Sequence, residues 1–302
     1  LALMIRAPAP GKALKFHESA GQFQVGPSGF WLTNPDNTLR GNVAGDAEGN
    51  GFWLAFPRKP TGPSANVAML PDRLPFGTFE HNVAHSNNAP GVLLNWAPVD
   101  DAGNVSPNQY MPTVDGREND WTNLIPVPLR RITSYKNMNG YGNNISLPDY
   151  QEWTVADNVG IGVTGKVHIG TMQRSLLVGQ SLNSATPYPQ VWPYEKQSAL
   201  ATYHSTLSMT DNTIVNFPFY DNEISGAWKT FDYYISGVDK GTIRNANNRL
   251  IATNPGFRVL PPHMDGKPLE NRHWTLSGAL WDPYGYWGPK GSYHVYDVPF
   301  LT

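Results

Sequence analysis

The sequence predicts an all-β chain built from stacked coils, as in a parallel β-helix. The phrase Gly-Phe-Trp-Leu occurs twice, at 29–32 and 51–54, and an Asn/Asp/Gly-rich connection separates the copies. A short apolar strand, a polar turn and the same strand again are typical of stacked coils. The chain holds 29 glycines and 27 prolines in 302 residues but only 15% charged residues, which favours short strands between turns over long amphipathic helices.

A repeat length supports the same fold. Asn137 and Asn158 follow strand-like runs and stand 21 residues apart, and another 21 residues reach Gly179 at the end of a third run. A period near 20 residues suits one coil of a β-helix with about three short strands. Asn side chains in register would stack as a polar ladder inside the turns and satisfy one another along the helix axis.

We expect residues 1–302 to form a single domain that is a piece of a longer precursor, because the chain lacks a start Met and a signal-peptide pattern. Its expected parts are an irregular lead-in (1–28), first coils (29–96), an inserted long loop (97–128), further coils (129–220) and an aromatic-rich C-terminal cap (221–302). Strand-like runs lie at 30–32, 52–56, 67–69, 76–79, 92–96, 132–137, 153–158, 174–180 and 207–217.

Two of these parts break the rhythm of the coils. The 97–128 loop is a candidate binding element, and its acidic residues between 100 and 120 could hold Ca²⁺. No complete calcium-loop signature is present, so an ordinary solvated loop is the alternative. In the C-terminal section, seven Trp and Tyr residues fall between 274 and 296. Such rings could stack on sugars, but covering the open end of a β-helix core is the favoured interpretation.

The composition excludes several classes of function. The formal net charge is −2 and no basic run occurs, which argues against non-specific nucleic-acid binding. Cysteine is absent, so the chain has neither a disulfide framework nor a thiolate metal site. No apolar run approaches the roughly 18 residues of a membrane span. We expect the candidate site to bind no metal ion and no cofactor.

Three phrases carry a resemblance to a known family: Gly-Phe-Trp-Leu-Thr-Asn-Pro at 29–35, Pro-Thr-Gly-Pro-Ser at 60–64 and Ala-His-Ser-Asn at 84–87. In these the chain resembles the parallel β-helix region of the cell-migration-inducing hyaluronan-binding, cell-surface hyaluronidase and fibrocystin-like family. The resemblance implies a right-handed parallel β-helix, an extracellular or cell-surface location and a role with large polysaccharides such as hyaluronan. It covers 29–95 continuously, returns at 132–137, 157–163 and 207–217, and fades toward the C-terminus.

The chain departs from the family pattern at its beginning. The small glycine-rich β domain and the first coils of the family have no counterpart here, so the resemblance implies the later part of the module and puts a catalytic role in doubt. A β-helix without its N-terminal cap exposes strand edges that invite pairing. We therefore expect self-association or a partner chain that supplies the missing coils.

Candidate site residues lie mainly in the first coils. If the protein cleaves a polysaccharide, we predict acid/base roles for Asp36, Asp46 and His85, because two carboxylates at short range suffice for glycoside hydrolysis and His titrates near neutrality. Lyase chemistry would need a base and a neutraliser of the uronate instead. The simpler interpretation is turn chemistry, in which Asp and Asn cap their own loops.

Other residues are predicted to hold the sugar chain. Arg40 and Arg58 could pair with a uronate carboxylate, and Trp31 and Trp53 could stack on sugar rings. His81 joins this predicted binding set. A metal shared by His81 and His85 is disfavoured, since residues four apart on a straight strand lie roughly 13 Å apart.

The sequence thus predicts an extracellular β-helix module that binds or processes an acidic polysaccharide, as a possible hydrolase or lyase. The alternative is a structural or adhesive β-helix that assembles with itself or a partner and does no catalysis. An enzyme would gather carboxylate, His and Arg on one face, whereas a stalk would spread them evenly.

Overall fold

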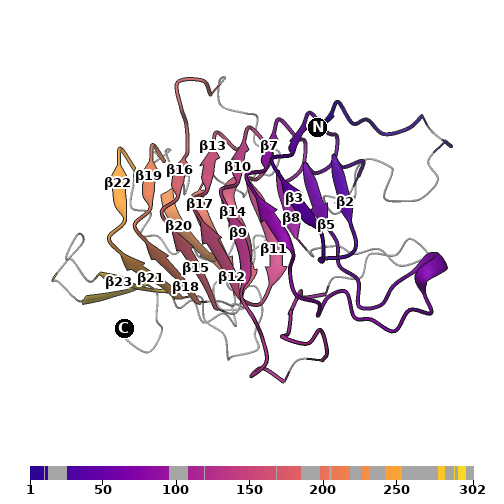
Figure 1. The fold of residues 1–302 in the computed structure, drawn as a ribbon. Helices are drawn as coiled ribbons and strands as arrows, with labels where there is room; N and C mark the ends of the chain where they lie inside the picture. Colours follow the sequence, from indigo (N-terminus) through magenta and orange to yellow (C-terminus); the bar gives the residue numbers. More distant parts are fainter. Residues whose placement is uncertain are drawn as a thin grey trace, which may run out of the picture.

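The computed structural model confirms the predicted parallel β-helix. It describes residues 1–9, 11–12, 26–94, 108–118, 120–167, 169–184, 198–203, 206–217, 226–231, 242–253, 278–282, 289 and 292–296. Three sheets of stacked parallel strands form the walls, and each successive coil adds one strand to each wall (Figure 1). The part of the chain that the structure describes contains no helix with the length and hydropathy of a membrane span.

The strands of each wall recur in the same order along the chain. Sheet A contains β1 (Ala2–Leu3), β4 (Val43–Gly45), β7 (Val83–His85), β10 (Thr133–Tyr135), β13 (Thr154–Ala156), β16 (Leu176–Val178), β19 (Thr213–Val215) and β22 (Arg249–Ile251). Sheet B contains β2 (Phe30–Leu32), β5 (Phe52–Leu54), β8 (Val92–Leu94), β11 (Tyr141–Ile145), β14 (Ile161–Val167), β17 (Ser198–Tyr203) and β20 (Gly226–Phe231). Sheet C contains β3 (Thr38–Arg40), β6 (Thr78–Glu80), β9 (Val127–Arg130), β12 (Pro148–Gln151), β15 (Ile169–Gln173), β18 (Thr206–Thr210), β21 (Thr242–Ala246), β23 (Gly278–Asp282) and β24 (Ser292–Tyr296).

The repeated Gly-Phe-Trp-Leu phrase forms two neighbouring rungs of sheet B, as predicted. Phe30 pairs with Phe52 and Trp31 with Trp53 in the strand register. The two Phe rings stack with centroids 4.9 Å apart, and the two Trp rings with centroids 5.4 Å apart. Identical side chains in register gain such contacts because stacked parallel strands are about 4.8 Å apart.

Tight corners at both ends of sheet A are made by residues with positive φ. The corner from sheet C into sheet A uses, coil after coil, Gly41, His81, Arg131, Glu152, Arg174, Asp211 and Asn247. The corner that leaves sheet A uses Asp46, Ser86, Lys136, Asp157, Asn216 and Ala252. This left-handed conformation is uncommon outside Gly, Asn and Asp. It persists at Arg131, Glu152 and Arg174 because the coils above and below fix the bend.

Buried asparagines follow these bends and tie the coils together. The side-chain oxygen of Asn158 accepts the backbone N–H of Asn137 at 3.0 Å, and that of Asn137 accepts the backbone N–H of Asn87 at 3.1 Å. At the other corner, Asn248 accepts from Asn212 at 2.8 Å. The predicted polar ladder is therefore present, and it satisfies backbone donors that the bends leave without strand partners.

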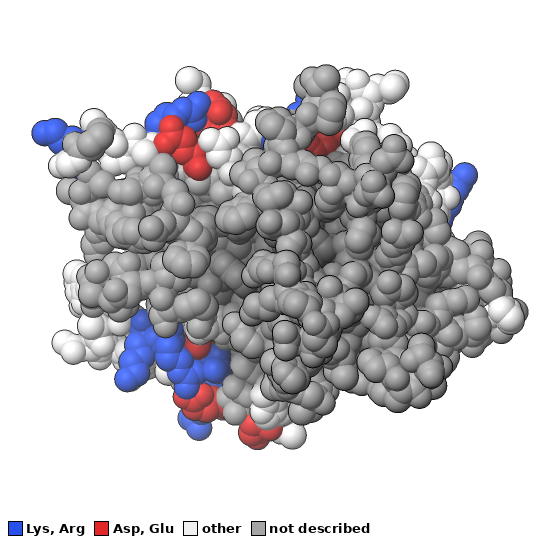
Figure 2. Space-filling view, turned by 180° about the vertical axis from the view of Figure 1, so that it is seen from behind, with Lys and Arg blue, Asp and Glu red and all other residues white. Residues whose placement is uncertain are grey.

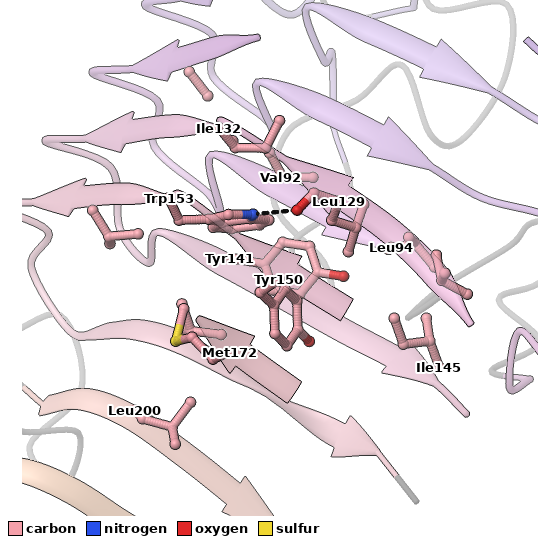
Figure 3. Packing of buried hydrophobic residues seen from close by; sticks show 14 of the residues in the cluster. Val92, Leu94, Leu129, Ile132, Tyr141, Ile145, Tyr150, Trp153, Met172 and Leu200 are labelled. Carbon is pink, nitrogen blue, oxygen red and sulfur yellow. Dashed lines mark hydrogen bonds between the residues drawn. The ribbon is translucent and has the colours of Figure 1, made fainter. Parts of the chain in front are cut away.

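The core is a column of inward side chains from all three walls. Tyr141, Tyr150 and Trp153 pack edge to face at its centre, with ring centroids 5.0–5.5 Å apart. Trp153 donates its indole N–H to the Leu129 carbonyl at 2.8 Å, which satisfies a buried polar group (Figure 3). In β7, β10 and β13 of sheet A the middle residue is buried, whereas the first and last residues of β5 and β8 in sheet B join the core. Both patterns follow the two-residue period of a strand.

The structure differs from the expected segmentation in three places. Within the lead-in, Ala2–Leu3 already pairs with β4. The 67–69 run is no strand, because Val67 and Met69 donate to local turn carbonyls, and the 3₁₀ turn η2 (Gly62–Ser64) lies in the same loop. Parallel strands also continue beyond 220 as β20 to β23, and among the described strands only β24 is antiparallel, where it pairs with β23. The remaining residues of the predicted aromatic cap lie outside the described residues.

The described part of the predicted inserted loop packs back onto the coils. Tyr110 bridges to Ile145, and its hydroxyl donates to the Leu74 carbonyl at 2.7 Å. Residues 108–118 therefore lie against the 57–77 loop that leads from sheet B to sheet C. Both loops leave the stack at the same corner, because they connect equivalent strands of neighbouring coils. Residues 95–107 lie outside the described residues.

Candidate functional site

The three predicted acid/base residues lie on two different corners of the coil. Asp36 belongs to the turn between β2 and β3, where its N–H is bound by the Asn34 side chain at 3.0 Å. Asp46 begins the opposite corner, and its carboxylate receives the Arg6 guanidinium at 2.6 Å. His85 is the neighbour of Asp46, whose N–H donates to the His85 carbonyl at 3.2 Å. Asp46 and His85 are thus joined through their backbones on neighbouring coils, and Asp36 lies at another corner.

His85 lies on the outer face of sheet A in a stack of its own. Its ring is parallel to that of Tyr135, with centroids 5.1 Å apart, and Nδ1 is 3.2 Å from Ser86 Oγ. On its other side lies Gly45, where an added Cβ would come within 2.6 Å of the His85 ring. Because the imidazole has a neighbour on each face, it presents its edge to the solvent.

The predicted sugar-stacking pair has one accessible member. Trp31 is 44% exposed on the outer face of sheet B, whereas Trp53 is only 1% exposed. Trp53 is covered because the next coil on either side places Trp31 and Leu93 against it. A ligand on this face would meet Trp31, and Trp53 supports that ring from behind.

Arg40 and His81 lie at the corner between sheets C and A. Arg40 ends β3 and pairs with Glu80, its register partner on β6. His81 directly follows Glu80, and its Nε2 is 3.4 Å from Nη1 of Arg131 on the next coil. The structure thus joins two predicted binding residues to an arginine that the sequence interpretation missed.

The same corner continues as a line of ion pairs. Arg131 donates Nε to Glu152 at 2.8 Å, and Arg174 contacts the other Glu152 oxygen at 3.5 Å. The hydrogen bond from Arg131 and the two positive charges lower the pKa of Glu152 below its ordinary value. These three residues are spaced by 21 and 22 positions, which is the coil period, so the period itself was the signal that could have found them.

Arg58 belongs to a separate ionic cluster between the two loops. Its guanidinium pairs with Glu118 and lies 3.6 Å from Asp72. Asp72 also contacts Arg73 at 3.0 Å and accepts a hydrogen bond from Asn108 at 3.0 Å. Burial raises the pKa of Asp72 above its ordinary value, although the neighbouring cations oppose this rise. Sequence reasoning missed this cluster because its members lie in loops without a period.

An open groove of about 490 Å³ adjoins this cluster. One wall is the 59–70 segment, and the other is the 116–118 turn. Lys59, Arg117 and Glu118 supply its charged groups, and the other lining residues of the 59–70 wall are apolar. The apolar lining residues are Pro60, Ala65, Val67, Ala68, Met69 and Leu70. Lys59 and Arg117 are exposed, whereas Glu118 bridges Arg58 and Arg73.

The described acidic residues of the predicted Ca²⁺ loop have protein partners. Asp115 lies 3.6 Å from Arg117, Glu118 is paired with Arg58, and Asp120 accepts the N–H groups of Thr122 and Asn123. Asp100 and Asp101 lie outside the described residues. Within the described ranges no group of three or more His, Asp or Glu residues is arranged to hold a metal ion. Calcium binding stays a prediction.

Charges of both signs lie together on the surface. On the face shown in Figure 2, the coloured side chains form small mixed groups, with blue and red atoms side by side along the lower and upper edges. Such a mixed distribution steers a polyanion only weakly at long range. Recognition would therefore depend on the local cations of the groove and of the corner.

Comparisons with known proteins connect this geometry to a family. Residues 9–92 match the family model described as the CEMIP β-helix. The chain is 30% identical over 182 residues to the mouse cell migration-inducing and hyaluronan-binding protein, and 29% identical over the same length to the human one. Each alignment covers 53% of this chain and 13% of the relative.

A second relative matches a shorter region. Human fibrocystin-L is 40% identical over 70 residues, which is 23% of this chain and 2% of that protein. The chain therefore spans only a small part of the length of the relatives it matches. The family-model match at 9–92 includes the Gly-Phe-Trp-Leu coils, whose register the structure shows. The resemblance of this parallel β-helix to the family of the cell migration-inducing and hyaluronan-binding proteins and fibrocystin-L is confirmed.

Proposed function

We propose that this chain is a binding module for an acidic polysaccharide of the hyaluronan class and that it acts outside the cell or at the cell surface. The observation that carries the proposal is the groove, whose lining combines apolar side chains with the cations Lys59 and Arg117. The matching β-helix region belongs to relatives whose name includes hyaluronan binding. The 59–70 wall of the groove falls inside the matched region.

The groove offers both kinds of contact that a uronic acid needs. The apolar face of a pyranose ring packs on an apolar surface, here that of Pro60, Val67 and Met69. The carboxylate requires a cation at the edge of the ring, and Lys59 and Arg117 lie on opposite walls. Ligand pockets commonly combine such an apolar lining with a few polar groups that fix orientation.

The carboxylates beside the groove support binding rather than cleavage. Glu118 bridges Arg58 and Arg73, and the Asp72 side chain is only 1% exposed. A buried Asp72 does not touch a ligand in the groove, so its role is to hold Arg58 and Arg73 in place. Glycoside hydrolysis needs two carboxyl groups that flank the bond to be broken. That arrangement is not formed by the described carboxylates around the groove.

The test is the binding of short hyaluronan oligosaccharides, measured by titration calorimetry at low salt. We expect the double variant Lys59→Ala/Arg117→Ala to weaken binding about tenfold, because two exposed charge pairs are each worth up to about 1 kcal/mol. Arg249→Ala, which removes an exposed arginine on sheet A, is the matched control and should bind normally.

Each alternative gives a different result in this experiment. Wild-type protein that binds no acidic oligosaccharide would overturn the proposal and leave the structural or adhesive role in front. Shortened polymer after prolonged incubation would replace binding by cleavage, and the variants of Asp36, Asp46 and His85 would then be tested first. If Arg249→Ala weakened oligosaccharide binding as much as Lys59→Ala/Arg117→Ala, the loss of binding would reflect the net charge of the protein and not a contact in the groove.

A further inference from the structure

The corner between sheets C and A carries a regular line of charged side chains, which we name the corner ladder. Its members are Arg40, Glu80, Arg130, Arg131, Glu152, Arg174 and Asp211. The backbone N–H of Arg131 donates to Gln151 at 2.8 Å, that of Glu152 to Gln173 at 3.0 Å and that of Arg174 to Thr210 at 3.1 Å. Successive rungs are therefore hydrogen-bonded neighbours, separated by the strand spacing of about 4.8 Å.

The sign of the charge alternates from coil to coil. The coils of β3, β9 and β15 contribute arginines, namely Arg40, then Arg130 and Arg131, then Arg174. The coils of β6, β12 and β18 contribute Glu80, Glu152 and Asp211 at the same corner. Positive rungs thus recur every two coils, at about 9.6 Å, and the three of them span about 19 Å along the axis.

The arginines of the ladder keep much of their surface open to the solvent. Their side chains are 64% exposed at Arg40, 45% at Arg131 and 50% at Arg174. The internal pairs engage only some of the five donors that each guanidinium has. A further carboxylate can therefore approach each positive rung without breaking the pair already present.

We propose that the corner ladder is a second contact surface, a track for a linear polysaccharide that carries one carboxylate per disaccharide. The proposal rests on the proposed function, because it assigns the polymer class that the module prefers. In an extended β-linked polymer, one disaccharide advances by nearly the height of two coils. Each carboxylate of such a polymer then meets an arginine rung, and the uncharged sugar between them meets a glutamate rung.

The negative rungs give the track its selectivity. A polymer with a carboxylate on every sugar, such as polygalacturonate, places every second carboxylate beside Glu80, Glu152 or Asp211. Like charges placed together in an interface disfavour the wrong partner. The alternating ladder therefore selects against the more highly charged polymer, which a uniformly basic surface would bind more strongly.

The test compares long hyaluronan with polygalacturonate of equal length on immobilised wild-type and variant protein. We expect Arg131→Ala/Arg174→Ala to weaken the binding of long hyaluronan about tenfold. Short oligosaccharides, which occupy only the groove, should bind this variant as they bind wild type. Arg249→Ala again serves as the matched control, since it removes an exposed arginine that is not a member of the ladder.

The substitution Glu152→Gln tests the selectivity directly. It removes one negative rung with little change of shape, so the preference for hyaluronan over polygalacturonate should fall about fivefold. Circular dichroism of each variant checks that the coils remain folded.

The results separate this inference from the proposed function. If Lys59→Ala/Arg117→Ala weakens binding but Arg131→Ala/Arg174→Ala does not, the track is wrong and the groove stands. An unchanged polymer preference in Glu152→Gln would also overturn the track. Failure of the wild type to bind either polymer would overturn both.

Discussion

Asn137 forms hydrogen bonds with the coils on both sides of its own, through Asn87 and Asn158. Its side-chain oxygen accepts from the backbone and the side chain of Asn87, and its amide donates to the Ala84 carbonyl at 3.2 Å and to Ser134 Oγ at 3.0 Å. The residue is 1% exposed, so no solvent replaces these bonds when the side chain is removed.

We therefore expect Asn137→Ala to lower the free energy of unfolding by about 3 kcal/mol, because it leaves buried donors without acceptors. Asn42→Ala is the matched control, since Asn42 makes the equivalent contact with Asn82 at 3.2 Å but is only half-buried. Its cost should be about 1 kcal/mol. Equilibrium unfolding in urea measures both values, and equal losses would show that burial of the amide does not matter.

The two links that Asn137 makes to neighbouring coils show which contacts of a single residue can be predicted from the sequence. The link between Asn137 and Asn158 follows from their 21-residue spacing and was predicted. The link between Asn137 and Asn87 spans 50 residues, because the chain between β8 and β9 leaves the stack before it returns. A hydrogen-bond partner can be predicted from residue spacing only where no insertion interrupts the coil. Partners on either side of an insertion are identified only once the fold is known.

At the scale of elements, the two loops that leave the stack between sheets B and C create the groove. Neither has a period, and Asp72 and Glu118 meet through arginines although they lie 46 residues apart. Arg58 was predicted as a ligand residue from its side-chain type alone. The sequence could not show that Asp72 and Glu118 already hold it, because loop contacts depend on where both insertions begin.

Asp72 gives the loop pair a measurable pH signature. Burial raises its pKa above the ordinary 3.8, so the folded protein binds this proton more tightly than the unfolded chain does. The contribution of Asp72 to stability therefore falls as the pH rises from the unfolded pKa through the raised folded pKa. This direction is opposite to that of a carboxylate whose pKa is lowered in the fold.

The measurement is the difference in unfolding free energy between the wild type and Asp72→Asn at a series of pH values from about 4 to 7. The variant removes the titration but keeps the shape, so the advantage of the wild type over the variant should shrink with rising pH. Glu152→Gln is a useful comparison, because the pKa of Glu152 is lowered in the fold. The difference in unfolding free energy between the wild type and Glu152→Gln should therefore grow as the pH rises. A wild-type advantage that grows with pH at Asp72 would contradict the argument.

For the molecule as a whole, the coils are similar in cross-section but not in length. Equivalent strands of sheet A are 21 residues apart from β10 to β13, 22 from β13 to β16 and 37 from β16 to β19. The sequence therefore predicted the fold from the two short coils and from the repeated Gly-Phe-Trp-Leu phrase. It placed the end of the coils too early, since the later coils carry insertions that hide their period.

This modular construction predicts that one coil can be removed. Deleting 133–153 joins Ile132 to Thr154 and places β13 against β7, where Asn158 can take the part of Asn137 beside Asn87. Each coil of such a stack contacts only its neighbours, so the shortened protein should unfold cooperatively at a lower temperature. Loss of cooperative unfolding would show that the Tyr141, Tyr150 and Trp153 cluster is indispensable.

The same deletion also removes Glu152 and sets Arg131 directly beside Arg174, one coil apart instead of two. The spacing of these positive rungs then falls from about 9.6 Å to about 4.8 Å. If the corner ladder selects polymers by the distance between charges, the shortened protein should move its preference from hyaluronan toward polygalacturonate. Binding of both polymers to the folded deletion variant measures this shift. An unchanged preference would show that the spacing of the arginine rungs does not determine which polymer is bound.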